Sequence, residues 1–317
     1  MRSPTSLALA LAAALGAAGC GTWSNEDIRF LEALPTRDEL RVVVPDGAAP
    51  AVAAAEGRTA AVAAACGPHG AAETWLSAKP TSDRLNASVD WILGLVDVVR
   101  RYPPTSRLDD GRIWGPFDDD RHPGIELRVV ILRSWPSGPE GPVEHAYAFE
   151  AREKAAGGPF TSLLSGTFVG PSALRGLGSL VLRFDRIRLL GMDDPDSPDG
   201  LMRVAYDRTA DPRAVDLALL DTGGFGLARF AYAFRGYADG RGWFRFAFED
   251  GLRGDRAVVE AGFDAAGAGQ ADVTFFPAAL GGGSVGYHQC WSADACLTYS
   301  DDASRYSCGD PAGCAFG

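Results

Sequence analysis

From residue 125 to residue 275, the chain consists mostly of short segments in which every second residue is hydrophobic. A period of two is typical of a β-strand with one buried face. About nine or ten such segments follow one another at hairpin spacing, with turn residues between them. No helical pattern of crossover length separates them, so the sequence predicts an antiparallel meander. The segments are Ile125–Ile131, His145–Phe149, Phe160–Phe168, Leu180–Phe184, Met202–Tyr206, Val215–Leu219, Phe230–Phe234, Phe244–Phe248, Val259–Phe263 and Val273–Phe275.

The segment before these strands has the period of a helix. Ser82 or Asp83 can cap a helix that runs to about Arg101 and ends before Pro103. Hydrophobic residues cover most of its circumference, so we expect this 83–101 helix to be largely buried. Its two adjoining apolar rows are Leu85, Val89, Ile92, Val96 and Val99, and Trp91, Leu95, Val98 and Tyr102.

These two patterns together predict the fold class. A long antiparallel meander leaves exposed edges unless its sheet closes or curls, and an apolar helix needs a cover. The sequence therefore predicts a mainly β fold of the α+β class, in which a long antiparallel meander forms a curved sheet or partial barrel wrapped around the 83–101 helix. In outline this resembles the half-barrels of periplasmic lipoprotein carriers, although none of their motifs occurs in the sequence.

Shorter elements are predicted nearer the N-terminus. Ser24 and Asp27 have the spacing of a capping box, which predicts a helix over Asn25–Leu34. The pattern of Leu40–Pro45 favours a short strand or extended link. Residues 58–66 are rich in alanine, which has the highest helix propensity, and a helix is predicted there.

The first twenty residues have the layout of an export signal. Arg2 gives a cationic start, residues 7–15 form an apolar run, and small residues stand directly before Cys20. This is the pattern of a secretory signal peptide over residues 1–19, and the apolar run is too short for a good membrane-spanning helix.

The cysteine at the end of this segment resembles the lipobox of bacterial lipoproteins. In that family a signal peptidase cleaves before the cysteine, whose thiol carries a diacylglycerol. Ala17 stands where the family prefers Leu, and ordinary secretion is the alternative. The resemblance implies that Cys20 is the lipid-bearing first residue of the mature chain. Gly21 follows it instead of Asp, the inner-membrane retention signal of enteric bacteria, so we expect an anchor in the outer membrane, on its periplasmic or surface face.

Further segments resemble lipoproteins of unknown function from high-GC bacteria of the myxobacterial type. They are Trp23–Asp27, Leu34–Arg37, Trp91–Asp97, Trp114–Phe117 and Cys290–Trp291. This resemblance spans most of the mature chain. It implies an outer-membrane lipoprotein and brings no known activity.

Composition narrows the classes of partner. The 30 basic and 41 acidic residues give a net charge of −11, which argues against nucleic acid and against a polybasic membrane patch. The predicted organisation is a signal peptide over 1–19, a lipid tether with short helices over 20–80, the helix and antiparallel β domain over 81–289, and a disulfide-stapled hairpin over 290–317.

Four of the six cysteines lie in this last segment. Export favours disulfides over metal, and the spacing of five residues within each close pair fits zinc poorly. In an antiparallel hairpin, the residue numbers of each directly opposed pair have the same sum. The sum of 290 and 314 equals that of 296 and 308, so both pairs could lie opposite each other in one hairpin. This predicts nested bridges, Cys290–Cys314 and Cys296–Cys308, with a structural and not a redox role. The alternative is two local loops, 290 to 296 and 308 to 314.

One further cysteine lies far from these four. With the nested pairing, Cys66 is left without a partner, and we expect it to be a buried free thiol.

Two motifs suggest hydrolases, but their context does not support catalysis. Asp221-Thr222-Gly223 resembles the catalytic loop of aspartic proteases, which needs a second copy or a dimer to supply the second carboxylate. No second copy occurs, so a strand that ends in a turn is the better interpretation. The segment 282–286 matches a nucleophile elbow, but the helix and the distant acid and histidine are missing.

An acidic loop over residues 193–200 offers carboxylates that could bind calcium, with Asp194, Asp196 and Asp199 as candidate ligands. Its register departs from known calcium loops, and a solvated hairpin loop is the preferred interpretation. The four histidines show no metal spacing, and His145 is expected to be a packed or surface residue.

The sequence thus favours a lipid-anchored, non-enzymatic envelope lipoprotein without a cofactor. It contacts the membrane through its lipid, binds no nucleic acid, and can hold an apolar or lipid-like small molecule in its curved sheet. The alternative is a structural or interaction lipoprotein with a filled core. A remote alternative is an aspartic-type hydrolase through Asp221-Thr222-Gly223.

Overall fold

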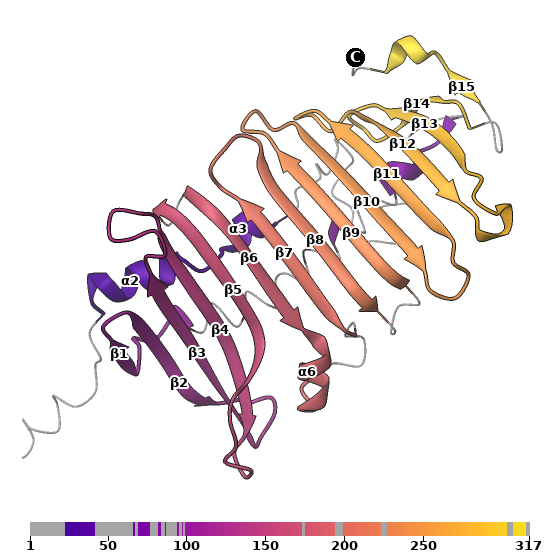
Figure 1. Cartoon of the computed structure of the whole chain (residues 1–317). Coiled ribbons are helices and arrows are strands. Elements are labelled where there is room, and N and C mark those ends of the chain that lie inside the picture. Colours follow the sequence, from indigo (N-terminus) through magenta and orange to yellow (C-terminus); the bar gives the residue numbers. More distant parts are fainter. Residues whose placement is uncertain are drawn as a thin grey trace, which may run out of the picture.

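The computed structural model describes residues 23–41, 66, 69–76, 82–83, 86, 94, 97, 99–172, 175–193, 199–222, 227–302 and 307–314. Its main feature is one sheet of fifteen antiparallel strands (Figure 1). Each strand pairs with the strand that follows it in sequence, and the first and last strands do not pair with each other. The fold is therefore mainly β and meandering, as predicted, and the sheet is open.

The strands are β1 (Ser106–Leu108), β2 (Gly111–Asp118), β3 (Ile125–Ser134), β4 (Val143–Glu153), β5 (Thr161–Ser172), β6 (Arg175–Arg183), β7 (Leu201–Asp207), β8 (Arg213–Thr222), β9 (Leu227–Gly236), β10 (Gly242–Asp250), β11 (Arg256–Phe263), β12 (Gly269–Phe276), β13 (Val285–Trp291), β14 (Leu297–Ser300) and β15 (Cys308–Gly309). The helices are α2 (Asn25–Glu32), α3 (Arg37–Leu40) and α6 (Phe184–Leu189), with 3-10 turns η3 (Ala278–Leu280) and η4 (Pro311–Gly313).

The ten segments predicted from the period of two correspond to strands β3 to β12. Two boundaries are wrong, because Phe160 precedes β5 and Phe184 begins α6. The sequence also did not predict β1 and β2, and it predicted a single hairpin over 290–317 where the structure has the end of β13, followed by β14 and β15. In β2 the pairing with β3 shifts between Trp114 and Phe117, so the alternation of buried residues is interrupted there.

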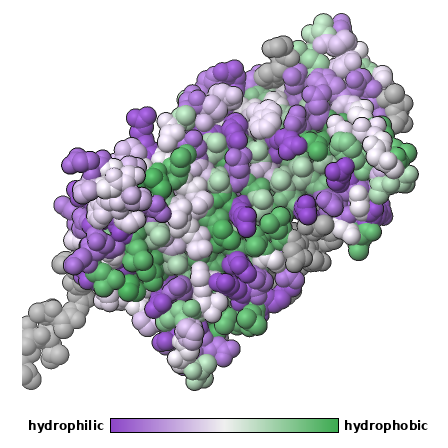
Figure 2. Space-filling model, in the orientation of Figure 1, coloured by the Kyte–Doolittle hydropathy of each residue, from purple (hydrophilic) through white to green (hydrophobic). Residues whose placement is uncertain are grey.

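The two faces of the sheet differ in chemistry. Side chains on the inner face form the core, together with Phe30, Leu34 and Leu40 from the N-terminal segment. Figure 1 shows α2 and α3 behind the sheet, and Figure 2 shows the uncovered face, where polar and apolar side chains are mixed. Buried residues of the inner face include Trp114, Ile131, Tyr147, Leu182, Val204, Tyr232, Phe244 and Phe263.

The outer face carries ion pairs between directly opposed residues of neighbouring strands. The pairs are Arg128–Glu150 at 2.6 Å, Arg152–Glu126 at 2.9 Å and Arg245–Glu260 at 2.9 Å. Exposed pairs of this kind contribute little stability individually, about 0–1 kcal/mol. Their alternation with the buried aromatic residues fixes which face of each strand points inward.

Glycines of the sheet are covered by aromatic rings on the neighbouring strand. A Cβ atom on Gly178 would lie 2.0 Å from the ring of Tyr206, its direct partner in the register. The glycine therefore leaves the space that the ring fills, which compensates for the weak strand propensity of glycine. The same relation holds for Gly166 with Tyr147, Gly242 with Phe263 and Gly269 with Trp291.

The predicted N-terminal helix is present with its capping box. The backbone N–H of Ser24 donates to the Asp27 carboxylate at 2.9 Å, and the N–H of Asp27 donates to the Ser24 hydroxyl at 3.1 Å. The helix ends at Glu32 and is followed by α3, whose own capping box joins Thr36 and Glu39. Leu40 is therefore helical and buried, which corrects the strand predicted from this residue onward.

The 83–101 helix is described only in part. Ser82, Asp83, Asn86, Gly94, Asp97 and Val99 are all helical, and Val99 is buried in the core. Most of the two apolar rows lie outside the described residues, as do residues 42–65 and the signal segment with Cys20. Within the described part of the chain, helices are all too short or too polar to cross a membrane.

Candidate functional site

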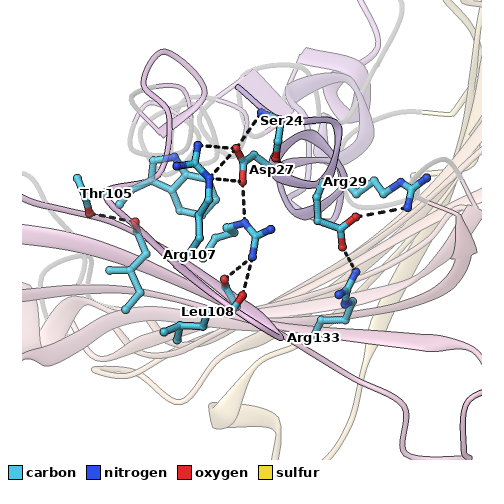
Figure 3. A network of polar contacts seen from close by, with 12 residues as sticks. Ser24, Asp27, Arg29, Thr105, Arg107, Leu108 and Arg133 are labelled. Atoms are coloured by element: carbon cyan, nitrogen blue, oxygen red, sulfur yellow. Dashed lines mark hydrogen bonds and ion pairs between the residues drawn. The ribbon is translucent and has the colours of Figure 1, made fainter. Parts of the chain in front are cut away.

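A buried ion network fixes α2 to the first strands of the sheet (Figure 3). Asp27 is completely buried, and its carboxylate accepts hydrogen bonds from Arg107 of β1 at 2.8 Å and Arg112 of β2 at 2.6 Å. Burial raises the pKa of Asp27, but hydrogen bonds from Arg107, the Ser24 backbone and Arg112 outweigh it and hold the pKa far below its usual range. The carboxylate is therefore ionised at neutral pH.

Aromatic contacts extend this network towards β3 and β4. The guanidinium groups of Arg112 and Arg133 lie 4.6 and 5.0 Å from the ring centre of Phe30. Each arginine thus makes a cation–π contact with this ring. Arg133 also pairs with Glu26 of α2. The rings of His145 and Phe30 are nearly perpendicular, with their centres 5.8 Å apart. Burial, with a smaller effect of Arg133, lowers the pKa of His145 to about 4. His145 is thus a packed, neutral histidine, as predicted.

At the opposite end of the sheet lies a cluster formed by a disulfide, a histidine and a carboxylate. Cys290 of β13 is bonded to Cys314, which directly follows η4, with a Cα–Cα distance of 5.4 Å. The Nε2 atom of His288 lies 3.2 Å from the sulfur of Cys290 and 3.8 Å from that of Cys314. Its Nδ1 atom lies 2.8 Å from the carboxylate of Asp272 on β12.

The predicted Cys290–Cys314 bridge is confirmed, but the second predicted bridge is wrong. Cys296 is bonded to Cys66, not to Cys308, and Cys308 is a half-buried free cysteine. The prediction of Cys66 as a free thiol is therefore also wrong. These two disulfides indicate an oxidising compartment outside the cytoplasm.

The physical reason is that the C-terminal cysteines do not lie on one hairpin. The chain turns back directly after β13, so Cys290 opposes Tyr299 and not Cys314. A third strand then pairs with β14, where Cys308 opposes Ser300. Cys296 lies at the early turn and forms a bridge pair with Ala71, which brings the N-terminal segment and its cysteine alongside.

The remaining sequence candidates do not converge on a site. Thr222 ends β8 and pairs with Leu227, so the protease-like motif sits at a strand end, while Gly223 lies outside the described residues. Asp199 forms an ion pair with Arg188. Two other calcium candidates, 194 and 196, lie outside the described residues, so the calcium hypothesis stays untested.

Sequence reasoning missed both polar clusters. For the C-terminal cluster a signal existed, because His288 and Cys290 are two residues apart in a strand and must share a face. For the network at α2 no signal existed, because Arg107 and Arg112 meet Asp27 only through the β1–β2 hairpin, which the sequence did not predict.

Comparison with known proteins gave no match. No family model matches the chain, no curated protein is similar to it, and no solved structure matches its fold.

Proposed function

We propose that this protein is a lipid-anchored, non-enzymatic envelope protein, and that the β1 end of its open sheet lies close to the membrane. The anchor is Cys20, expected from the lipobox-like segment. The single observation that carries the proposal is the way in which α2 is fixed to the sheet directly after that cysteine. The two disulfides support it, because they need the oxidising surroundings that export provides.

The distance between the anchor and the sheet follows from chain length. Trp23 is only three residues after Cys20, and a chain spans at most ~3.6 Å per residue, so the two Cα atoms can be no more than about 11 Å apart. Asp27, four residues further on, is bound by two arginines of β1 and β2. A lipid on Cys20 would therefore hold the β1 end of the sheet close to the bilayer.

The inner face supports an interaction or structural role over a carrier role. The aromatic rows of β9 and β10 face each other, and Tyr232, Phe234 and Phe244 are buried against their neighbours. A face filled by its own side chains is what an interaction lipoprotein with a filled core requires. A sheet curved around the 83–101 helix, with space for an apolar ligand between them, is the second candidate, because an aromatic face can also line a cavity.

The anchor is tested by Cys20→Ser in the native host, with Cys308→Ser as the matched control for loss of a thiol. We expect the wild type and Cys308→Ser to fractionate with the outer membrane and to incorporate labelled fatty acid, and Cys20→Ser to do neither. If Cys20→Ser stays with the membrane, the proposal is wrong.

The filled core is tested by native mass spectrometry of protein purified from the host. A filled core predicts the mass of the chain and its lipid alone, whereas a co-purifying apolar molecule of defined mass would favour the carrier. The remote hydrolase alternative predicts peptidase activity that Asp221→Asn abolishes, and we expect no such activity.

A further inference from the structure

We propose that the Cys290–Cys314 disulfide is a thiol–disulfide exchange site, and that His288 stabilises the thiolate released when an envelope dithiol reduces it. The sequence alone suggested only a structural role for this bridge. The structure places a histidine side chain against both of its sulfurs, which a purely structural bridge does not need. The proposal is independent of the lipid anchor.

The orientation of His288 is fixed by its neighbours. A carboxylate only accepts hydrogen bonds, so the 2.8 Å contact to Asp272 places a proton on Nδ1 and leaves Nε2 facing the sulfurs. The imidazole ring also lies 6.1 Å from the ring of Tyr299 on β14, and the backbone N–H of His288 donates to Asp301. Asp272 is therefore a positioning residue, in the manner of the carboxylates that orient catalytic histidines.

Burial decides which sulfur is attacked. Cys290 is only 1% exposed, whereas Cys314 is half-buried. An incoming thiolate therefore reaches the sulfur of Cys314, forms a mixed disulfide with it, and breaks the bond to Cys290. The electron pair of that bond leaves with Cys290, whose thiolate forms 3.2 Å from Nε2 of His288 and accepts a hydrogen bond or a proton from this nitrogen when it carries one.

The second half of the reaction completes the balance. The remaining thiolate of the dithiol attacks its own sulfur in the mixed disulfide and releases Cys314 as a thiolate. The dithiol is oxidised to a disulfide, and the protein gains two electrons and two protons as a pair of thiols. The proposal specifies the reductant only by its chemical class, a dithiol.

The second disulfide of the chain is a built-in control. Cys66 and Cys296 are both half-buried, so they are at least as accessible as Cys290 and Cys314. Within the described residues, the sulfur of Cys296 makes its polar contact with the backbone carbonyl of Asp294, at 3.7 Å. Exposure alone predicts that this bridge is reduced at least as fast, whereas stabilisation by His288 predicts the opposite order.

The experiment measures the reduction of each bridge in purified, oxidised full-length protein. Dithiothreitol is added, samples are alkylated at intervals, and peptide mass spectrometry follows each cysteine. We expect Cys290–Cys314 to be reduced about tenfold faster than Cys66–Cys296, because a stabilised thiolate leaves faster. His288→Gln should remove that difference, and Asp272→Asn, whose carboxylate is largely exposed, should reduce it about threefold.

The pH dependence separates this role from a structural one. The ratio of the two reduction rates cancels the concentration of reductant thiolate, so a change of this ratio with pH reports on the groups beside the two bridges, and we expect such a change in the wild type. The ring contacts Asp272 and Tyr299, the backbone N–H of His288 contacts Asp301, and Glu260 lies opposite Asp272 on the next strand. The His288 variant leaves all four in place. In His288→Gln the ratio should not change with pH.

Two results would overturn the proposal. One is equal reduction rates for the two bridges in the wild type. The other is a His288→Gln protein with an unchanged thermal midpoint, in the oxidised state, whose rate ratio and pH profile match those of the wild type. A uniform change of both rates in His288→Gln would also contradict it, because the effect must be confined to Cys290–Cys314.

Discussion

Replacing Asp27 with asparagine tests whether the ion network fixes α2. The change Asp27→Asn keeps the shape of the side chain and an oxygen that can still accept the Ser24 N–H. It removes the charge that compensates Arg112, whose side chain is only 7% exposed. Breaking a buried ion pair on one side costs about 3–5 kcal/mol, because the other charge stays buried.

Arg107 adds less to this cost than Arg112 does, because its side chain is 43% exposed and can turn to the solvent when the carboxylate is lost. The expected loss for Asp27→Asn is therefore ~3–5 kcal/mol, which lowers the thermal midpoint by roughly 6–15 °C for a chain of this size. Arg107→Gln is the matched control, and it should lower the thermal midpoint less than Asp27→Asn does, because Arg112 still pairs with the Asp27 carboxylate.

Calorimetry gives the thermal midpoints, and hydrogen exchange of the α2 amides shows whether the helix detaches first. The double variant Asp27→Asn with Arg112→Met should recover part of the loss, because it removes the uncompensated cation. If Asp27→Asn melts within 1 °C of the wild type, roughly the error of the measurement, and its α2 amides exchange at the wild-type rate, the reasoning about this network is refuted.

Three further predictions concern the sheet and its bridges. Gly178→Ala should destabilise the protein by about 1–3 kcal/mol in thermal denaturation, whereas Gly262→Ala should not, because a Cβ atom there would meet only the carbonyl of Gly242 at an ordinary contact distance of 3.9 Å. For His145 the unfolded chain binds the extra proton, so stability should fall as pH drops from 6.5 towards 4, and His145→Gln should flatten this dependence of the thermal midpoint. Cys296→Ser, which breaks the bridge to Cys66, should cost about 2–5 kcal/mol in calorimetry.

The middle of the sheet could be predicted from the sequence because each strand carries its own evidence. A strand with one buried face shows a period of two within its own residues, whichever strand pairs with it. The order of strands then follows from the short connections, since these permit only antiparallel neighbours. The capping box at Ser24 and Asp27 was likewise visible, because both partners lie within four residues.

The ends of the sheet could not be predicted in this way. In β2 the register shifts between Trp114 and Phe117, so the period is lost. The strands β14 and β15 are too short to show a period at all. The error in the disulfides has the same origin, because an equal sum of residue numbers indicates opposed cysteines only within one uninterrupted hairpin, and the turn after Trp291 breaks that condition.

The meander also determines how far apart the two polar clusters lie. Each strand advances the sheet by ~4.8 Å, and β13 is twelve strands after β1, so the His288 cluster lies about 58 Å along the sheet from the network around Asp27. Figure 1 shows α2 and the C-terminus at opposite ends of the sheet. A lipid at Cys20 would thus hold one end at the membrane and present the disulfide with His288 well away from it. An exchange site placed there can meet a soluble dithiol protein without approaching the bilayer, which a site near β1 could not do.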